Sequence, residues 1–395
     1  MNKKFQKSNW VITISTVAIL FVPEITLSAD WSAFRRDSNR AGADAEISFY
    51  SPINLKWTAV LNNGYTYSSP IVYGETVFIG SSEGKLFAFN RKTGVKGWEY
   101  TAKGTIHSTP AAGDGIVCFG CSDGYFYALN ISDGSLKWKY YIGNSINSSP
   151  AISGTNVYFG ANNGYLYSLD ITSGADAENW PKNIGCHLWS SPAVSNRVVY
   201  IGGYDGSLYA FNASTGNQKW VYSCGSEIRS TPAIANNTLY FTLYNGNIYA
   251  IDLLNSTNEK VVEKWPHKQL GLGMAVASSP SVADGVVYIT ANADYKPQSP
   301  PFQFPPWLPY VRLYALDASS GNESWSVSIA NGYGGFHPYS SPAVSKDCIF
   351  ITTRDNNQVA KISAFDRLSG AVKWEYNIGF STKISPAISK GWLYL

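Results

Sequence analysis

Eight proline-containing sites in the chain are preceded by side chains that could bind a ligand or a metal ion. Three positions before each proline, the residues are Tyr67, His107, Asn147, Trp189, Arg229, Ala277, Tyr339 and Lys383. Two positions earlier, the residues are Tyr65, Thr105, Ser145, His187, Glu227, Ala275, His337 and Ser381. Three of the four histidines fall into these two sets, beside an arginine, a glutamate and several aromatic residues. Convergent polar and aromatic groups of this kind are typical of a ligand-binding pocket.

These sets favour a binding pocket over a metal site or a hydrolase. A metal ion needs ligand nitrogens at about 2.1 Å, whereas His107, His187 and His337 belong to the second, fourth and seventh sites along the chain. No Gly-x-Ser-x-Gly or His-Glu-x-x-His motif occurs. The alternative is that the first residues of an inner strand are wetted and free to vary. The residues we expect to bind a ligand are Tyr65, Tyr67, His107, Asn147, His187, Trp189, Glu227, Arg229, His337, Tyr339 and Lys383.

The proline sites belong to an internal repeat with a period of about forty residues. A Ser/Thr-Pro pair recurs at Ser69-Pro70, Thr109-Pro110, Ser149-Pro150, Ser191-Pro192, Thr231-Pro232, Ser279-Pro280, Ser341-Pro342 and Ser385-Pro386. A tryptophan precedes each pair, at Trp57, Trp98, Trp138, Trp180, Trp220, Trp265, Trp325 and Trp374. Eight tryptophans in register indicate eight copies of one structural unit.

Each unit reads as four short strands joined by tight turns. In the fourth unit the strands are Ser191-Pro-Ala-Val, Val198-Val-Tyr-Ile, Ser207-Leu-Tyr-Ala-Phe and Gln218-Lys-Trp-Val-Tyr. A dipeptide ending in glycine, such as Asp205-Gly206, follows the second strand and favours a hairpin turn. Four-stranded antiparallel units repeated radially form a β-propeller with the first strand innermost. We therefore predict an all-β, eight-bladed propeller whose two variable sets line one mouth of a central channel.

The strand count also predicts how the ring closes. Trp57 stands in a fourth-type strand that comes before the first inner strand, so it must complete the blade begun by the last repeat. The chain ends at Leu395 inside the eighth second-type strand, which leaves the last blade truncated by one strand. We expect a lead-in segment at 30–56 and a single propeller at 57–395.

A proline-rich insertion at 292–312 replaces the hairpin between the second and third strands of the sixth unit. A proline-rich loop loses little conformational entropy on docking, so we expect a lid or a partner-binding loop on the side of the variable sets. The alternative is that its aromatic residues pack onto the sixth and seventh blades. These aromatic residues include Phe302, Phe304, Trp307 and Tyr310.

The first 29 residues have the layout of a signal peptide. Three lysines precede an apolar run from Trp10 to Val22, and Leu27-Ser28-Ala29 offers a cleavage site. The run is too short to span a bilayer of about 30 Å. We therefore expect an exported protein that is periplasmic, secreted or at the cell surface, and peripheral to a membrane at most. The remaining chain has 27 basic and 26 acidic residues, which does not favour binding to nucleic acid.

Five cysteines in an exported protein leave at least one unpaired. Cys118 and Cys121 lie on one predicted strand, where their Cα atoms are about 10 Å apart and their side chains are on opposite faces, beyond the disulfide limit of about 7 Å. Cys186 and Cys224 occupy nearly matching places in neighbouring repeats and are the better candidate pair, which would leave Cys348 free.

The repeat resembles that of the pyrroloquinoline-quinone-repeat propellers, whose tryptophan-docking motif reads Tyr-Ala-Leu/Phe-Asp/Asn, Thr-Gly, Trp. The segment from Leu208 to Trp220 carries this motif, and the resemblance covers nearly all of residues 31–395. It implies that the tryptophan of one blade stacks on the Thr-Gly turn of its neighbour. The opening Trp-x-x-Phe-Arg-x-Asp-x-x-Arg-x-Gly signature of exported members is matched by Trp31, Phe34, Arg35, Asp37, Arg40 and Gly42.

The family includes dehydrogenases that hold pyrroloquinoline quinone with calcium, and non-catalytic members similar to the outer-membrane assembly scaffold BamB. The enzymes carry two adjacent cysteines, and those fused to a haem module carry Cys-x-x-Cys-His; neither motif occurs here. We therefore expect a non-catalytic scaffold or recognition module without a cofactor, which binds an envelope protein or a small ligand such as a glycan. The alternative is a quinone-dependent alcohol-type dehydrogenase, in which Arg229 pairs with the quinone carboxylates and Glu227 or Asp205 serves calcium or acts as a base.

Overall fold

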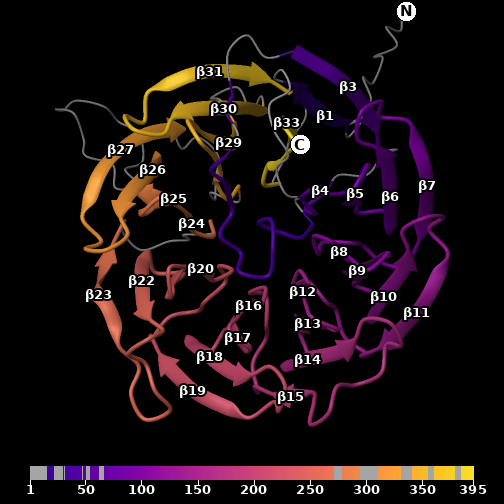
Figure 1. Cartoon of the computed structure of the whole chain (residues 1–395), viewed down its shortest axis with the longest axis horizontal. Coiled ribbons are helices and arrows are strands. Elements are labelled where there is room, and N and C mark those ends of the chain that lie inside the picture. Colours follow the sequence, from indigo (N-terminus) through magenta and orange to yellow (C-terminus); the bar gives the residue numbers. More distant parts are fainter. Residues whose placement is uncertain are drawn as a thin grey trace, which may run out of the picture.

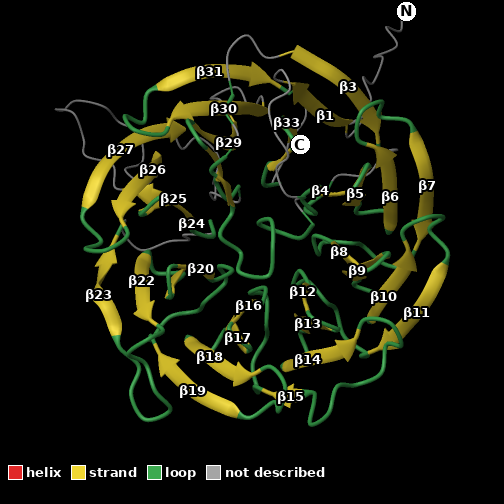
Figure 2. Cartoon of the chain, viewed as in Figure 1, coloured by secondary structure: helices red, strands yellow, loops and turns green. Residues whose placement is uncertain are grey.

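The structure is a computed structural model that describes residues 16–21, 30, 32–46, 48–49, 54–61, 66–270, 278–293, 310–330, 340–354, 360–378 and 384–395. Within these residues every regular element is a β-strand, and the sheets are arranged around one axis (Figures 1 and 2). The prediction of an all-β propeller with four-stranded antiparallel blades is confirmed.

Seven blades are each made of four consecutive strands, called A, B, C and D from the axis outward. Blades one and two contain β4 (Ile71–Tyr73), β5 (Thr76–Gly80), β6 (Lys85–Asn90), β7 (Lys96–Thr101), β8 (Ala111–Gly113), β9 (Ile116–Gly120), β10 (Tyr125–Asn130) and β11 (Leu136–Tyr141). Blades three and four contain β12 (Ala151–Ser153), β13 (Asn156–Gly160), β14 (Tyr165–Asp170), β15 (Lys182–Asn183), β16 (Ala193–Ser195), β17 (Val198–Gly202), β18 (Ser207–Asn212) and β19 (Gln218–Ser223).

Blades five to seven follow the same plan with longer strands toward the end of the chain. They contain β20 (Ala233–Ala235), β21 (Thr238–Thr242), β22 (Asn247–Asp252), β23 (Glu263–Gln269), β24 (Ser281–Ala283), β25 (Val286–Ala293), β26 (Tyr310–Asp317), β27 (Glu323–Ala330), β28 (Ala343–Ser345), β29 (Cys348–Arg354), β30 (Ala360–Asp366) and β31 (Val372–Asn377). The middle strands are buried on both faces, as β9 and β21 show, because each blade is covered by its two neighbours. The D strands alternate between half-buried and exposed residues, as β7 shows.

The last sheet, called the closing sheet, departs from the prediction. It contains β32 (Ala387–Ser389), β33 (Trp392–Tyr394), β1 (Thr16–Phe21) and β3 (Asn54–Val60), in that order. The strand of Trp57 does close the ring as the D strand. The sheet is not short of a strand, however, because β1 pairs with both β33 and β3 at the C position. Seven complete blades, not eight, are thus built from the repeats alone.

The tryptophan of one blade docks on the C-to-D turn of the next, as the family resemblance implies. Trp98 Nε1 donates a hydrogen bond to the backbone oxygen of Ile131 at 2.9 Å. A Cβ atom on Gly134, which has a φ of +72°, would lie 2.5 Å from the Trp98 ring. Only glycine satisfies both the turn and the ring above it. Equally close approaches of a tryptophan ring occur at Gly94, Gly174, Gly321 and Gly370.

The repeated Ser/Thr-Pro pairs join neighbouring blades through hydrogen bonds around the axis. Ser149 Oγ accepts from Thr109 N at 3.0 Å, and Ser149 N donates to Ser191 Oγ at 2.9 Å. Ser385 N donates to Ser69 Oγ at 2.9 Å, which links the closing sheet to blade one. The hydroxyl before the proline is therefore part of the ring closure in these pairs. The same bond joins Ser69 to Thr109, Thr231 to Ser279, Ser279 to Ser341 and Ser341 to Ser385.

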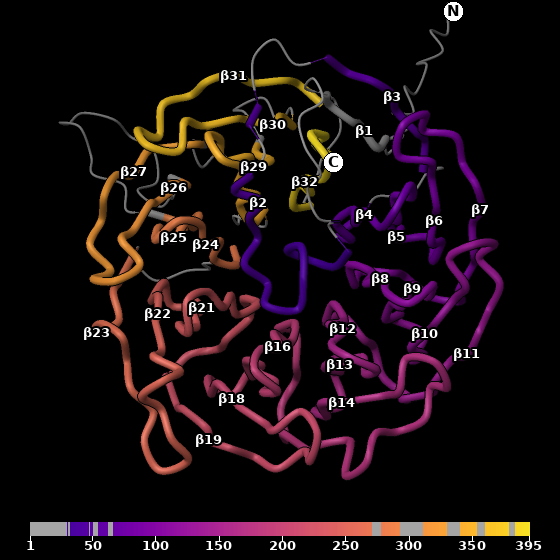
Figure 3. The backbone as a smooth tube through the Cα atoms, in the orientation of Figure 1, coloured from indigo at the N-terminus to yellow at the C-terminus, as the bar shows by residue number. Residues whose placement is uncertain are grey.

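The lead-in segment crosses the middle of the ring and bonds to A strands that are far apart in sequence (Figure 3). Ser32 O accepts from Ala112 N of blade two at 2.7 Å. Ser38 O accepts from Val194 N of blade four, also at 2.7 Å. The segment ends in β2 (Ala43–Asp44), which pairs in parallel with β28. Further carbonyl groups of the segment, those of Asn39, Ala41 and Gly42, accept from Ile234, Val282 and Val344.

Two buried arginines anchor the lead-in segment to backbone oxygens at the Ser/Thr-Pro pairs. Burial lowers the pKa of both guanidinium groups to about 9. Arg35 and Arg40 of the exported-type signature are thus structural residues. Arg40, which is fully buried, donates at 2.6–3.1 Å to the backbone oxygens of Ser149, Pro150 and Pro192. Arg35 donates to the backbone oxygens of Ser279 and Pro280 and to the hydroxyl of Ser281.

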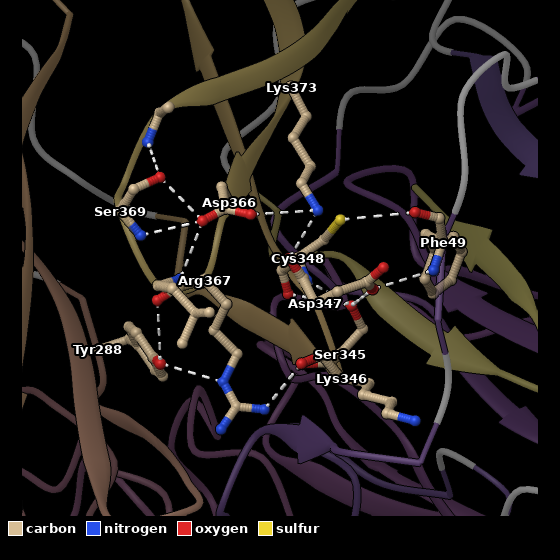
Figure 4. Close-up of polar contacts among 12 residues, drawn as sticks. Phe49, Tyr288, Ser345, Lys346, Asp347, Cys348, Asp366, Arg367, Ser369 and Lys373 are labelled. Carbon is tan, nitrogen blue, oxygen red and sulfur yellow. Dashed lines mark hydrogen bonds and ion pairs between the residues drawn. The ribbon is translucent and has the colours of Figure 1, made fainter.

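Blades six and seven meet the lead-in segment in a polar cluster at the turns that follow β28 and β30 (Figure 4). Arg367 follows β30, and its Nε donates to Tyr288 Oη of blade six at 3.1 Å. Its Nη2 pairs with Asp284 Oδ2 at 2.7 Å. Phe49 N of the lead-in segment donates to Asp347 Oδ1 of blade seven at 3.0 Å. The lead-in segment is therefore fixed at its end as well as across the axis.

All five cysteines are free thiols, so the predicted pair between Cys186 and Cys224 is wrong. Cys186 lies against Gly203 of blade four, whereas Cys224 Sγ lies 3.5 Å from the backbone oxygen of Tyr222. Burial raises the pKa of the Cys224 thiol to about 12. Among the described residues, no helix is long and apolar enough to cross a membrane.

Candidate functional site

The face of the ring that carries the D-to-A loops and the B-to-C hairpins, called the mouth face, holds the described members of both variable sets. Backbone hydrogen bonds fix its inner rim. Tyr204 N donates to His187 O at 3.2 Å, and Tyr244 N donates to Glu227 O at 2.8 Å. The same hairpin-to-loop bond, at 3.0 Å, joins Ser122 to Thr105 in blade two and Asn162 to Ser145 in blade three.

Part of the predicted site falls outside the described residues. Tyr310 of the proline-rich insertion begins β26, but its side chain is not among those that the structure describes. The structure therefore places seven of the eleven predicted ligand-binding residues. Those outside are Tyr65, His337, Tyr339 and Lys383 of the variable sets, with Phe302, Phe304 and Trp307 of the proline-rich insertion.

Tyr67, His107 and Asn147 form one group across the first three repeats. The rings of Tyr67 and His107 meet edge to face with centroids 4.9 Å apart. Asn147 hydrogen-bonds to His107, and its Oδ1 accepts from Ser145 Oγ at 3.2 Å. Burial lowers the pKa of His107, and the bond to Asn147 opposes part of this effect. Burial therefore favours the neutral form of the His107 imidazole.

A second group on blades four and five has Arg229 at its centre. The guanidinium carbon lies 4.3 Å from the ring centroid of Tyr244, 4.9 Å from that of Tyr204 and 5.7 Å from that of Trp189. Glu227 Oε2 accepts from Arg229 Nε at 2.8 Å and lies 2.7 Å from Nη2. We call this group the mouth cluster, and its members are His187, Trp189, Tyr204, Glu227, Arg229 and Tyr244.

The mouth cluster combines a fixed cation with an exposed aromatic ring. The ring of Trp189 is 5.4 Å from that of Tyr204 and remains 45% exposed. Arg229 and Glu227 are 34% and 37% exposed, so their ion pair adds only about 0–1 kcal/mol to stability. Its effect is to orient the guanidinium, together with cation–π contacts on three sides. Burial raises the pKa of Tyr204 to about 12, so its phenol stays protonated and can donate a hydrogen bond.

Sequence reasoning named four members of the mouth cluster and missed Tyr204 and Tyr244. Both occupy the residue before the Asx-Gly pair of a B-to-C hairpin. The equivalent residues in the first three blades are Ser82, Ser122 and Asn162. Comparing this hairpin position between the repeats would have singled out blades four and five, because only they carry an aromatic residue there.

The described mouth residues do not match the needs of a carboxylated quinone with a calcium ion. The guanidinium of Arg229 already forms an ion pair with the carboxylate of Glu227. Asp205 accepts from Ser207 N at 3.0 Å and from the Tyr209 hydroxyl, a turn-capping arrangement rather than an open ligand position. Among the described residues, no group of three His, Cys, Asp or Glu side chains is placed to hold a metal ion. We therefore assign no reaction step to a quinone.

The family described as outer membrane protein assembly factor BamB matches the chain over residues 54–184, 175–296 and 309–395. The chain belongs to the pyrroloquinoline-quinone-repeat β-propeller family. No curated protein matches the sequence.

Solved structures of dehydrogenases and of BamB share the propeller fold with this family member. The quinohemoprotein alcohol dehydrogenase from Comamonas testosteroni has a TM-score of 0.72 at 16% identity, covering 91% of this chain and 74% of the dehydrogenase. BamB from Moraxella catarrhalis has a TM-score of 0.64 at 18% identity, covering 83% and 96%. A europium-containing methanol dehydrogenase has a TM-score of 0.69 at 14% identity, covering 90% and 87%. Identities of this size establish the shared fold alone.

Proposed function

We propose that the protein is an exported, non-catalytic recognition propeller that binds a protein partner through the mouth cluster. The observation that carries this proposal is the setting of Arg229, which Glu227 and three aromatic rings hold beside the exposed Trp189. Trp, Tyr and Arg are the residues most enriched in the hot spots of protein interfaces. A guanidinium that is already oriented loses less side-chain entropy when a partner binds.

The frame beneath the mouth cluster supports this function by holding it rigid. Trp189 and Arg229 stand three residues before prolines whose preceding residues bond the blades together, Ser191 through its hydroxyl and Thr231 through its backbone N–H. Arg40 Nε of the lead-in segment donates to the backbone oxygen of Pro192, three residues after Trp189, at 3.1 Å. Binding residues on rigid elements keep their geometry better than residues on free loops. The closing sheet belongs to the same frame, because Ser385 N donates to Ser69 Oγ and so links this sheet to blade one.

An envelope protein is the partner class that fits the chain best. The leader-like first 29 residues and the family match to the assembly factor BamB both support a role in the cell envelope. The proline-rich insertion at 292–312 is proposed as a further contact for the same partner. The protein would then position another polypeptide without transforming a substrate.

A photoreactive amino acid in place of His187 tests the proposal in cells. We expect a discrete protein adduct in the envelope fraction, and we expect Arg229→Ala or Trp189→Ala to reduce its yield at least about tenfold, as for an interface hot spot. Tyr141→Ala is the matched control, because it removes a 65% exposed aromatic residue outside the cluster. An adduct that survives both cluster substitutions would refute the assignment.

The quinone-dependent dehydrogenase is the second candidate, favoured by the similarity of the whole propeller to dehydrogenase structures. Addition of pyrroloquinoline quinone and calcium to the purified protein distinguishes the two. We expect no saturable change in the quinone absorbance and no dye reduction with alcohols. Alcohol-dependent dye reduction that disappears in the Arg229→Ala variant would favour the enzyme.

A further inference from the structure

We propose that one arc of the rear face of the ring is a docking surface for a membrane of anionic phospholipids. The rear face carries the A-to-B hairpins and the C-to-D turns, and it lies opposite the mouth face because consecutive strands of a blade run antiparallel. The arc spans blade seven, the closing sheet, blade one and blade two, whose D strands follow one another along the outer rim as β31, β3, β7 and β11 (Figure 1). We call it the rear arc, and the residues that carry the proposal are Val95, Lys96, Leu136, Lys137, Leu368 and Val372.

The rear arc exposes aliphatic side chains to water. Leu368 is 88% exposed, Val95 65%, Val372 56% and Leu136 42%. Leu55 at the start of β3, which is 43% exposed, continues the row on the closing sheet. These five are half of the ten large hydrophobic residues that are exposed in the described part of the chain. Exposed apolar residues that gather on one part of a surface mark an interaction site.

Equivalent positions of the repeats show that the aliphatic residues belong to this arc and not to the frame. Two positions before the repeated tryptophan, three of the four sheets in the arc carry Leu55, Leu136 or Val372. Blade one has Lys96 at this position, with Val95 directly before it. At the same position, blades three to six carry Glu178, Gln218, Glu263 and Glu323. The same site in the repeat is therefore apolar or basic on one side of the rear face and mostly acidic on the other.

Lysines stand beside the aliphatic residues of the rear arc. An exposed lysine directly follows the aliphatic residue at Lys96, Lys137 and Lys373. Lys96 pairs with Glu99, and Lys373 pairs with Asp366. Ion pairs between such exposed side chains are weak, so these lysines can still reach a lipid phosphate. Asp366 and Asp133 accept hydrogen bonds from backbone N–H groups of their own turns, which holds these carboxylates within the turns.

The residue types of the rear arc favour a lipid surface over a protein partner. Protein interfaces are enriched in Trp, Tyr and Arg and depleted in Lys, which describes the mouth cluster and not the rear arc. Aliphatic side chains at the boundary between headgroups and acyl chains, with lysines near the lipid phosphates, are the pattern of binding to an anionic membrane surface. A propeller docked by the rear arc would turn its mouth face away from the bilayer.

Flotation of the full chain with vesicles of phosphatidylglycerol and phosphatidylcholine in equal parts tests the charge of the rear arc. We expect the wild type to bind, and we expect the double variant Lys96→Glu/Lys137→Glu to bind at least about tenfold more weakly, because both charges lie near the lipid phosphates. Lys219→Glu is the matched control, because Lys219 directly precedes Trp220 in blade four as Lys137 precedes Trp138. It should change the affinity by less than about twofold, since it lies outside the rear arc. Every variant keeps the apolar run from Trp10 to Val22, so differences between the variants report on the rear face.

Two leucines at equivalent positions test the apolar part of the rear arc. Leu368 and Leu254 both stand two residues after the aspartate of a C-to-D turn, and Leu254 of blade five is 73% exposed. We expect Leu368→Ser to weaken vesicle binding at least about threefold and Leu254→Ser to leave it unchanged. Both positions are exposed, so neither change should affect folding.

The outcome for the rear arc is separate from the outcome for the mouth cluster. Arg229→Ala should leave the affinity for vesicles unchanged, whatever it does to the binding of a protein partner. Equal affinities of the wild type and the double lysine variant, or equal effects of the two leucine substitutions, would overturn the proposal. A wild type that does not bind the vesicles would overturn it in favour of an acidic protein as the occupant of the rear arc.

Discussion

The segment that leads into each A strand carries two layers of residues that lie only a few positions apart and differ in kind. The Ser/Thr-Pro layer is nearly the same in every repeat, and its hydroxyls and carbonyls bond neighbouring blades and the buried Arg40. The layer three residues earlier holds Tyr67, His107, Asn147, Trp189 and Arg229 in successive repeats. Residues stay alike where one blade must bond the next, and they diversify where the strand meets the mouth face.

Substitution of Arg40, which bonds to the Ser/Thr-Pro layer, should cause the largest loss of stability among the changes predicted here. Arg40→Ala leaves three buried backbone oxygens without their donor, which we expect to cost at least about 3 kcal/mol of unfolding free energy. Urea denaturation followed by tryptophan fluorescence measures this loss. Arg197→Ala, at an exposed turn, is the control and should change stability by less than about 0.5 kcal/mol. Similar losses for the two variants would contradict the anchoring role.

Substitution of two glycines distinguishes the contribution of tryptophan docking to stability from that of the turn conformation. Gly134 and Gly154 both have positive φ, but only Gly134 lies under a tryptophan ring, and nothing lies within 4 Å of a Cβ on Gly154. We expect Gly154→Ala to cost about 1 kcal/mol for its backbone conformation and Gly134→Ala to cost about 2–3 kcal/mol in total, because the ring must also shift. Thermal unfolding of both variants tests the difference, and equal costs would argue against docking.

Two residues of the segment that leads into β12 compare the layers directly. Ser149→Ala leaves the buried Thr109 N without its acceptor, and we expect a loss of about 1–2 kcal/mol. Asn147→Ala, two residues earlier on the mouth face, should change stability by less than about 0.5 kcal/mol. The same chemical denaturation assay applies to both. A larger loss at Asn147 than at Ser149 would reverse the roles assigned to the layers.

The smallest expected effect is the pH response of the mouth face. Because the pKa of His107 is lower in the folded protein than in the unfolded chain, the unfolded state takes up the proton first as the pH falls. The contribution of neutral His107 is complete above the unfolded pKa of about 6.5 and is lost as the pH falls below it. His107→Gln should therefore flatten the decline of the urea midpoint between pH 7 and pH 5. An unchanged slope would show that other groups dominate.

Much of the ring was readable from the sequence, because period and turn chemistry are local signals. The Trp57 strand could be assigned to the last sheet by counting strand types. The hydrogen bonds between the Ser/Thr-Pro pairs could not be predicted. A repeat shows that residues are equivalent, but it does not show which atoms they bond. The role of β1 was hidden too, since an apolar run after lysines has the pattern of a leader whatever strand it pairs with.

The candidate site divides in the same way. Trp189, Glu227 and Arg229 were visible because they break an otherwise regular position. Tyr204 and Tyr244 contact Arg229 from two B-to-C hairpins. The Asx-Gly pairs of these hairpins indicate only a turn and do not predict what the preceding residue contacts. Arg40 matched a family signature, but its acceptors lie more than a hundred positions away in the chain, and no local pattern encodes such pairing.

The threaded lead-in segment has a consequence for the order of events during synthesis. Gly42 emerges early from the ribosome, yet the amide that it bonds belongs to Val344, about three hundred residues later in the chain. Contacts of such long range form late, after the intervening loop entropy has been offset by local blade formation. The lead-in segment is therefore synthesised first but is among the last parts of the chain to reach its folded position. Arg35 and Arg40 stay in contact with water until the blades that hold their acceptor oxygens have formed.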